Sequence, residues 1–210
     1  MFPDEEIPLF VDFEDLIRYH FGAFAFTGGG KSNLVANLIR KAYYLRDDVK
    51  VVIFDISCEY IVLLLDILCK GENAIVVSPT ASGKTEAVVA PLVERLLKEK
   101  WRGLSILYIT PTRALANDLY HRLRGQLASL GVEVSVKTGD RPHFNPNSPP
   151  NFLITTPESL DSMLCRFRDS LRDVKATVLD ELHLIDGTYR GDQLRILLRR
   201  LEENIEEHPN

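Results

Sequence analysis

Two stretches of the sequence contain the residue types that hold phosphate groups. Residues 25–32 read AFTGGGKS and residues 78–85 read SPTASGKT, so each ends in Gly-Lys followed by Ser or Thr. In the phosphate-binding loop Gly-x-x-x-x-Gly-Lys-Ser/Thr, backbone N–H groups and a helix N-terminus surround the anion, the lysine reaches the β- and γ-phosphates, and the hydroxyl reaches Mg²⁺. Ala25 and Ser78 replace the first glycine of that pattern. Both stretches are predicted nucleotide-binding loops, and the alternative for each is a plain tight turn.

Hydrolysis of a bound nucleotide needs further groups, and a later stretch has them. It requires a carboxylate to hold Mg²⁺ and a base or polariser for water. In TVLDELH, residues 177–183, an apolar run is followed by Asp180 and Glu181. Because the following loops of parallel strands open at one edge of a sheet, we expect these carboxylates at the same edge as the phosphate loops.

The segments around these residues alternate between two patterns. Strand-like apolar runs are expected at 23–27, 51–55, 73–78, 104–110, 132–138, 152–156 and 176–181, and amphipathic helices at 31–45, 84–100, 113–131 and 159–171. Most of the strand-like runs are apolar throughout, which is typical of strands buried on both faces. The pattern predicts an α/β fold with a mostly parallel sheet flanked by helices. The Pro- and Asn-rich stretch 139–151 is expected to be a surface loop.

The composition and net charge of the chain limit the kinds of function that it can have. The chain has 210 residues and a formal net charge of -5, so any nucleic-acid binding must come from local basic patches. The three cysteines have no metal-ligand spacing and favour a reducing compartment. The first ten residues lack the basic start of a signal peptide, and the longest apolar run, 61–68, is too short to cross a bilayer. We expect a cytoplasmic protein without a membrane partner.

Five short segments occur in the order of known helicase motifs. They are PTASGKTE (79–86), PTRALAND (111–118), TGD (138–140), TTPESL (155–160) and DELH (180–183). In this the chain resembles the superfamily 2 DEAD/DEAH-box helicases, and residues 180–201 look specifically like the Lhr-like group. The resemblance implies a P-loop NTPase fold, the first RecA-like lobe of an ATP-dependent helicase.

The resemblance also implies roles for individual residues. The nucleotide-binding (Walker A) loop would comprise Thr80, Ala81, Ser82, Gly83, Lys84 and Thr85. Catalysis would fall to Lys84, Asp180 and Glu181, with Mg²⁺ held by Thr85 and by Asp180 through water, Glu181 positioning the attacking water, and His183 coupling the nucleotide site to the rest of the motor. Hydroxyls, a guanidinium and backbone amides can hold a strand's phosphates without reading bases; the residues expected to do so are Thr112, Arg113, Thr138, Gly139, Thr156 and Pro157.

The first third resembles a different family. Residues 14–42 and 51–60 look like the start of a HerA-like DNA-translocase ATPase, with a second P-loop at Gly28, Gly29, Gly30, Lys31 and Ser32. The later parts of such an ATPase, including a Walker B strand, are missing. We therefore expect a partial HerA-like βαβ segment at 1–65 and a helicase lobe at 66–210 that is truncated before motif III, and we assign the working site to residues 79–86.

Three readings of the whole chain stay open. The leading one is a helicase-type motor fragment that binds and hydrolyses ATP and contacts the backbone of DNA or RNA, with a second RecA-like lobe in another chain as a candidate partner. The rival is a non-catalytic nucleotide-binding or interaction module, and the third is a recombined sequence without a function of its own. The resemblance places the missing motif III strand between the strands of motifs I and II. We therefore predict that strand 51–55, or else 23–27, lies beside 73–78 in one continuous sheet.

Overall fold

The computed structural model describes residues 30–45, 61–77 and 83–206. Contacts within the chain divide it into two units, residues 1–89 and residues 90–210. The division falls inside helix α4 (Lys84–Lys98).

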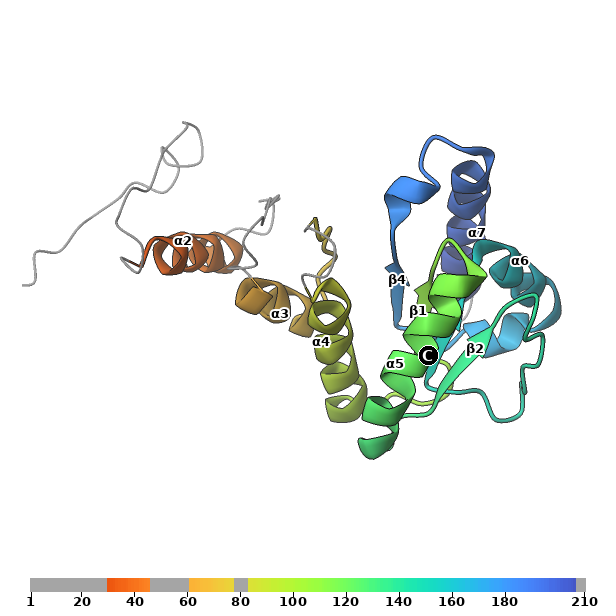
Figure 1. The fold of residues 1–210 in the computed structure, drawn as a ribbon. Coiled ribbons are helices and arrows are strands. Elements are labelled where there is room, and N and C mark those ends of the chain that lie inside the picture. The colour runs from red at the N-terminus through yellow and green to blue at the C-terminus, as the bar shows by residue number, and fades with distance from the viewer. Residues whose placement is uncertain (1–29, 46–60, 78–82, 207–210) are drawn as a thin grey trace, which may run out of the picture. The chain divides into compact units, whose positions relative to one another are not determined.

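The second unit contains a four-stranded parallel sheet (Figure 1). Its strands are β1 (Ile106–Ile109), β2 (Val134–Lys137), β3 (Phe152–Thr155) and β4 (Ala176–Leu179), in the order β2-β3-β1-β4. The register is regular: Ile106 lies opposite both Phe152 and Ala176, and Phe152 lies opposite Val134. The strands expected at 104–110, 132–138, 152–156 and 176–181 are confirmed with ends shifted by one to two residues, and so is the α/β fold.

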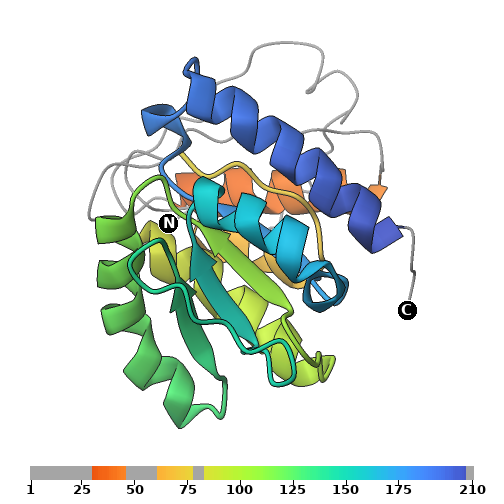
Figure 2. The same ribbon diagram turned by 90° about the vertical axis from the view of Figure 1, so that its right-hand side faces the viewer.

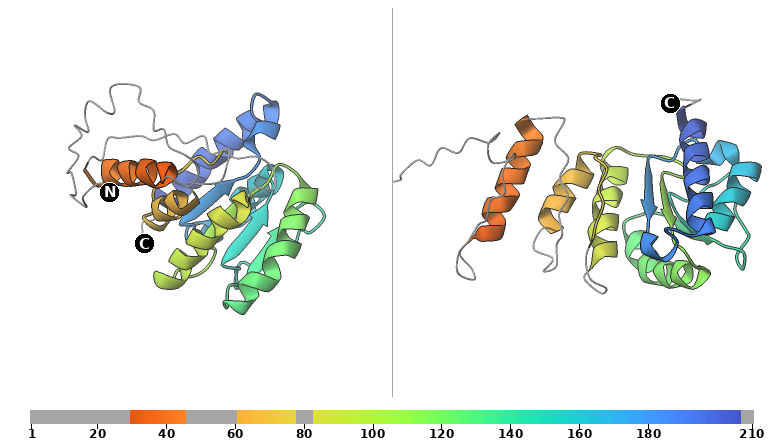
Figure 3. Two further views of the ribbon diagram at one scale, coloured as in Figure 1. Left: turned by 60° about the vertical axis from the view of Figure 1, so that its left-hand side comes forward. Right: turned by 90° about the horizontal axis from the view of Figure 1, so that it is seen from above.

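The connections place helices on both faces of this sheet. Helix α5 (Arg113–Ser129) joins β1 to β2, whereas α6 (Pro157–Arg166) joins β3 to β4 in the opposite direction across the sheet. Because such crossovers are right-handed, opposite directions put the two helices on opposite faces. Helix α7 (Tyr189–Glu206) packs beside α6, as Figures 2 and 3 show.

Alternating side chains of the strands form two apolar layers. Leu107, Ile109 and Leu153 belong to a buried cluster completed by leucines of α6 and α7. The intervening residues include Tyr108 and Phe152, which are buried and have ring centroids 6.0 Å apart. Strand β1 is buried along its whole length, as a central strand should be.

Strand β4 differs from β1. Within the described residues it pairs on one side only, with β1. Its four residues are partly or fully exposed, whereas those of β1 are all buried. The other side of β4, where no described strand pairs, is where the resemblance to helicases places a further strand. The segments 23–27 and 51–55, proposed to fill it, lie outside the described residues, so that part of the expectation stays a prediction.

The regular elements in the described part of the first unit are helices. It contains α2 (Lys31–Leu45), α3 (Ile61–Cys69) and the first turns of α4. The helix expected at 31–45 is confirmed, and the apolar run near the predicted junction is α3. The strand expected at 73–78 is not part of the described sheet; residues 72–76 are irregular and Val77 makes a single bridge. None of the described helices is long and apolar enough to cross a membrane.

Helix ends differ from the sequence expectation in two places. The helix expected at 113–131 stops at Ser129, because the N–H groups of Gly131 and Val132 bond back to Ala128 and Leu127 and Gly131 has φ +76°. The helix expected at 159–171 begins earlier, at Pro157, a residue suited to a first helical position. It breaks at Phe167 and continues as the 3-10 helix η1 (Arg168–Leu171).

Candidate functional site

The Gly-Lys-Thr end of the helicase-type loop has the local geometry that a phosphate loop needs. Gly83 has φ +79°, a left-handed conformation that glycine adopts readily, and nothing lies within 4 Å of the position of an added Cβ. Helix α4 begins directly at Lys84, and its first hydrogen bond runs from Ala87 N–H to the carbonyl of Gly83 over 2.9 Å. A glycine in this conformation followed by a helix N-terminus with a lysine fits a nucleotide phosphate. Thr80, Ala81 and Ser82 lie outside the described residues.

The second glycine loop ends in the same way. Gly30 has φ +76° with open space around an added Cβ, α2 begins at Lys31, and Leu34 N–H bonds to the carbonyl of Gly30 over 2.9 Å. Gly28 and Gly29 are outside the described residues, and of Ser32 only its place in the helix is described. The backbone conformation is therefore the same at these two helix N-termini and does not show which loop binds the nucleotide.

The acidic pair follows β4, as the sequence predicts. The N–H of Asp180 donates to the carbonyl of Ile109, which extends the β1–β4 ladder by one residue. The carboxylate of Asp180 accepts from Glu181 N–H over 3.0 Å. Glu181 has φ +47°, a left-handed conformation that is strained for a residue with a side chain. The turn aims its carboxylate at His183, with 3.2 Å between Oε2 and Nδ1. Such strain is common at functional sites.

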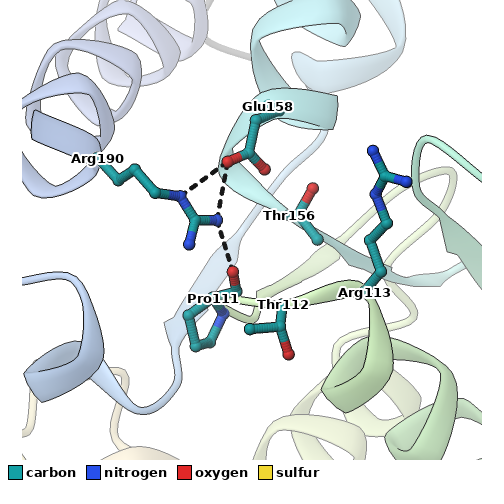
Figure 4. A pocket seen from close by; sticks show the side chains of 6 residues that line it. All are labelled: Pro111, Thr112, Arg113, Thr156, Glu158 and Arg190. Atoms are coloured by element: carbon teal, nitrogen blue, oxygen red, sulfur yellow. Dashed lines mark hydrogen bonds and ion pairs between the residues drawn. The ribbon is translucent and has the colours of Figure 1, made fainter.

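A cavity of about 340 Å³ opens at the carboxyl edge of the sheet. The residues that line it come from three separate segments of the chain and are Pro111, Thr112, Arg113, Thr156, Glu158 and Arg190 (Figure 4). Three of the six expected strand-binding residues, Thr112, Arg113 and Thr156, therefore meet at one cavity. They do so because β1 and β3 are neighbours in the sheet and end at the same edge.

Local hydrogen bonds explain the positions of the two threonines. Thr112 is the N-cap of α5, and its hydroxyl accepts from Leu115 N–H over 3.3 Å. Thr156 precedes α6 in an extended conformation, and its hydroxyl lies 3.4 Å from that of Ser159. Pro157, the first residue of α6, is buried. Both threonines thus lie where the N-terminus of a helix faces the cavity edge, a position that favours an anion.

The remaining expected strand-binding residues lie beside Arg113. The guanidinium of Arg113 forms an ion pair with Asp140, with 2.6 Å from Nη1 to Oδ1. It also lies against Gly139, where an added Cβ would be 2.8 Å from Nη2. Thr138 is 1% exposed, and its hydroxyl has no hydrogen-bond partner among the residues that the structure describes. The 138–140 turn therefore holds Arg113 by a carboxylate and by close backbone approach.

The sequence assigns no role to Pro111, Glu158 or Arg190, which also line this cavity. Pro111 and Glu158 lie within expected motifs, whereas Arg190 lies beyond the last of them, DELH at 180–183. Other arginines of α7 make ion pairs at the surface: Arg195 with Asp192, Arg199 with Glu203, and Arg200 with Asp161 of α6. Arg190 instead reaches two distant segments, and only the fold could reveal that.

Comparison with known proteins identifies the family. A family model described as DEAD/DEAH box helicase matches residues 61–209. The chain belongs to this family. A second model, described as the central domain of the helicase HerA, matches residues 1–87. Both resemblances found in the sequence are thereby confirmed.

Individual helicases support the assignment. The chain is 35% identical over 162 residues to the Lhr helicase/probable uracil glycosylase of Mycolicibacterium smegmatis, covering 66% of this chain and 11% of that protein. It is 36% identical over 135 residues to the ATP-dependent DNA helicase Hel308 of Pyrococcus horikoshii, covering 64% and 18%. The chain thus spans less than a fifth of the length of these relatives.

A solved helicase structure has the same fold. The DUF1998 helicase MrfA bound to DNA and AMPPNP superimposes with a TM-score of 0.61 and 26% identity, covering 70% of this chain and 22% of MrfA. Another crystal structure of the DUF1998 helicase MrfA gives a TM-score of 0.62, 25% identity and coverage of 80% and 27%. The helicase-type sheet of the second unit is therefore found in a protein crystallised with both a nucleotide analogue and DNA.

Proposed function

We propose that this DEAD/DEAH box helicase chain binds Mg·ATP at residues 79–85 and holds one nucleic-acid strand by its backbone at the cavity beyond the carboxyl ends of β1 and β3. The observation that carries the proposal is the meeting of Thr112, Arg113 and Thr156 at one cavity. Hydroxyls, a guanidinium and helix N-termini recognise phosphates rather than bases. The site therefore suits a strand of any sequence.

The proposed nucleotide site comprises Gly83, Lys84 and the acidic pair Asp180 and Glu181. Lys84 would hold the phosphates, while Thr85 and Asp180 supply the hydroxyl and carboxylate oxygens that Mg²⁺ prefers. Bound Mg²⁺ would neutralise the charge that develops on the transferred phosphoryl group. Glu181 would position the attacking water, and the bond between its N–H and Asp180 keeps the two carboxylates in one turn.

The DNA-bound MrfA structure supports DNA as the strand, since 70% of this chain superimposes on it. RNA has the same phosphates, so it is tested in parallel. The relatives are several times longer, and a second RecA-like lobe in another chain remains a proposed partner. Turnover by this chain alone is expected to be slow, because a second lobe supplies the arginine fingers in the helicases it resembles.

The deciding experiment measures ATP turnover without nucleic acid, with single-stranded DNA and with single-stranded RNA. Wild-type chain is compared with Lys84→Ala at equal concentration. We expect stimulation by at least one strand type and its loss in Lys84→Ala. Nucleotide binding without any turnover would favour a non-catalytic binding module. Turnover equal in the two proteins would overturn the assignment of Lys84.

A further inference from the structure

Arg190 joins the two segments that form the proposed strand site. Its Nη2 donates to the carbonyl of Pro111 over 2.6 Å. Its Nε donates to Oε1 of Glu158 over 2.9 Å, and Nη2 lies 2.8 Å from the same oxygen. Figure 4 shows the guanidinium between the Pro111 backbone and the Glu158 side chain. A single planar group thus connects the chain after β1 with the first turn of α6.

A compact turn brings Arg190 to this position. Within it, Thr188 donates its hydroxyl to the carbonyl of Ile185 over 2.6 Å, and Gly191 N–H bonds to the carbonyl of Thr188 over 2.9 Å. A Cβ on Gly191 would collide with the carbonyl oxygen of Ile185. Any other residue at 191 would therefore push the turn open. Arg190 and Gly191 act together: the glycine permits the close approach and the arginine makes the connection.

The carboxylate of Glu158, which pairs with Arg190, is favoured in its charged form. Burial raises the pKa of Glu158, but hydrogen bonds from its own backbone N–H, from Arg190 and from Thr156 outweigh burial and hold the pKa below its ordinary value. Charge-assisted hydrogen bonds of this kind are among the stronger polar contacts. The connection therefore persists at neutral pH.

We propose that Arg190 is a positioning residue that sets the spacing between the Thr112 and Thr156 sides of the strand site. The inference rests on the proposed strand binding and adds a residue to it. Because Arg190 follows Asp180 and Glu181 in the same connection, the segment that bears the acidic pair also holds the strand site together. A rival role is direct contact between Arg190 and a strand phosphate.

Two variants that preserve charge separate these roles. Arg190→Lys keeps the positive charge but loses the planar group that contacts Pro111 and Glu158 together. Glu158→Asp keeps the negative charge but shortens the side chain by one carbon. If Arg190 positions the site, both variants weaken strand binding. If Arg190 instead contacts phosphate, Glu158→Asp releases it and binding stays equal or becomes tighter.

The first measurement is the affinity for fluorescent single-stranded DNA, by anisotropy at several salt concentrations. We expect about tenfold weaker binding for Arg190→Lys and for Glu158→Asp, and no further loss in the double variant, because both remove one connection. The control is Arg195→Lys on α7, whose exposed side chain pairs with Asp186 and Asp192. Affinity for a fluorescent ATP analogue should stay within twofold of wild type in all variants. Unchanged or tighter strand binding by Glu158→Asp would overturn the inference.

A second measurement does not depend on strand binding. Hydrogen exchange is followed at the amides of Ala116 and Leu160, which bond to the carbonyls of Thr112 and Thr156. Faster exchange at both in Arg190→Lys, but not in Arg195→Lys, supports the positioning role. Equal exchange in the two variants contradicts it. If wild-type chain binds no strand, the proposed function fails, and this exchange experiment still decides the role of Arg190.

Discussion

The guanidinium of Arg113 is held by the carboxylate of Asp140, 2.6 Å from Nη1 to Oδ1, although the two residues are 27 positions apart. Both side chains are more than half exposed, at 60% and 58%. A cation expected to hold a strand phosphate is therefore already paired within the chain. An incoming phosphate must share Arg113 with Asp140 or displace it.

Asp140→Asn should strengthen strand binding for this reason. An exposed ion pair contributes about 0.2–1 kcal/mol, so we expect an affinity gain of about 1.4-fold to fivefold, larger at low salt. Anisotropy titrations with single-stranded DNA measure it. The control is Asp169→Asn, which neutralises an exposed carboxylate paired with Arg172 on the surface. Weaker binding by Asp140→Asn would mean that Asp140 orients Arg113 for the strand rather than competing for it.

Lys84→Ala should reduce Mg·ATP affinity more than Lys31→Ala does. Contacts from a lysine to phosphate are charge-assisted, so the loss at Lys84 should exceed about 1.5 kcal/mol, or roughly tenfold in affinity. Titration of a fluorescent ATP analogue against both variants tests this. Gly30 and Gly83 have nearly the same φ, which makes the pair a matched comparison. A larger loss at Lys31 would move the working site to residues 28–32.

Glu181→Gln should keep nucleotide binding and lose most hydrolysis, because it removes the water-positioning carboxylate and leaves the phosphate loop intact.

Glu181→Gly should lose the same activity yet unfold at higher denaturant concentration. Relief of the left-handed strain at φ +47° outweighs the extra chain entropy of glycine by about 0.5–1 kcal/mol. Chemical denaturation and ATP turnover are measured on the same samples. Full turnover in Glu181→Gln would remove Glu181 from the catalytic set.

Lys137→Met should stabilise the second unit. Lys137 is 5% exposed and has no ion-pair partner among the residues that the structure describes. Burial, with repulsion from Arg166, lowers its pKa below the ordinary 10.5. The folded chain thus binds this proton less tightly than the unfolded chain, and protonation destabilises the fold. We expect a gain of about 1 kcal/mol at pH 7 in denaturant unfolding.

The pH dependence provides the check on Lys137. Wild-type stability should rise as the pH increases from the lowered pKa toward 10.5, because in this window the folded chain has released the proton while the unfolded chain still binds it. The advantage of Lys137→Met should therefore shrink toward pH 10. Lys175→Met, at an exposed position, should show little gain at any pH. A pH-independent gain would attribute the effect to packing of the methionine rather than to charge.

The sequence by itself determined the local parts of this protein. Apolar runs and amphipathic segments predicted four strands of the described sheet and helices α2, α4 and α5 closely, because these patterns depend on neighbouring residues only. Residue types next to strand-like runs led to the predicted roles of Lys84 and Asp180, and the resemblance to helicases to that of Thr112; that their loops share one edge follows from parallel strands. The end of α5 and the break of α6 were missed, because they depend on a glycine turn and on a non-helical Phe167.

Only the tertiary structure decided how these parts meet. The order β2-β3-β1-β4 results from crossovers that skip strands, and nothing local encodes which strand lies beside which. The pairing of Arg113 with Asp140 spans 27 positions and that of Arg190 with Pro111 spans 79. The sequence pattern of a surface helix is the same whether a long side chain on it faces solvent or connects two loops. Its role depends on which backbone groups the fold places within its reach.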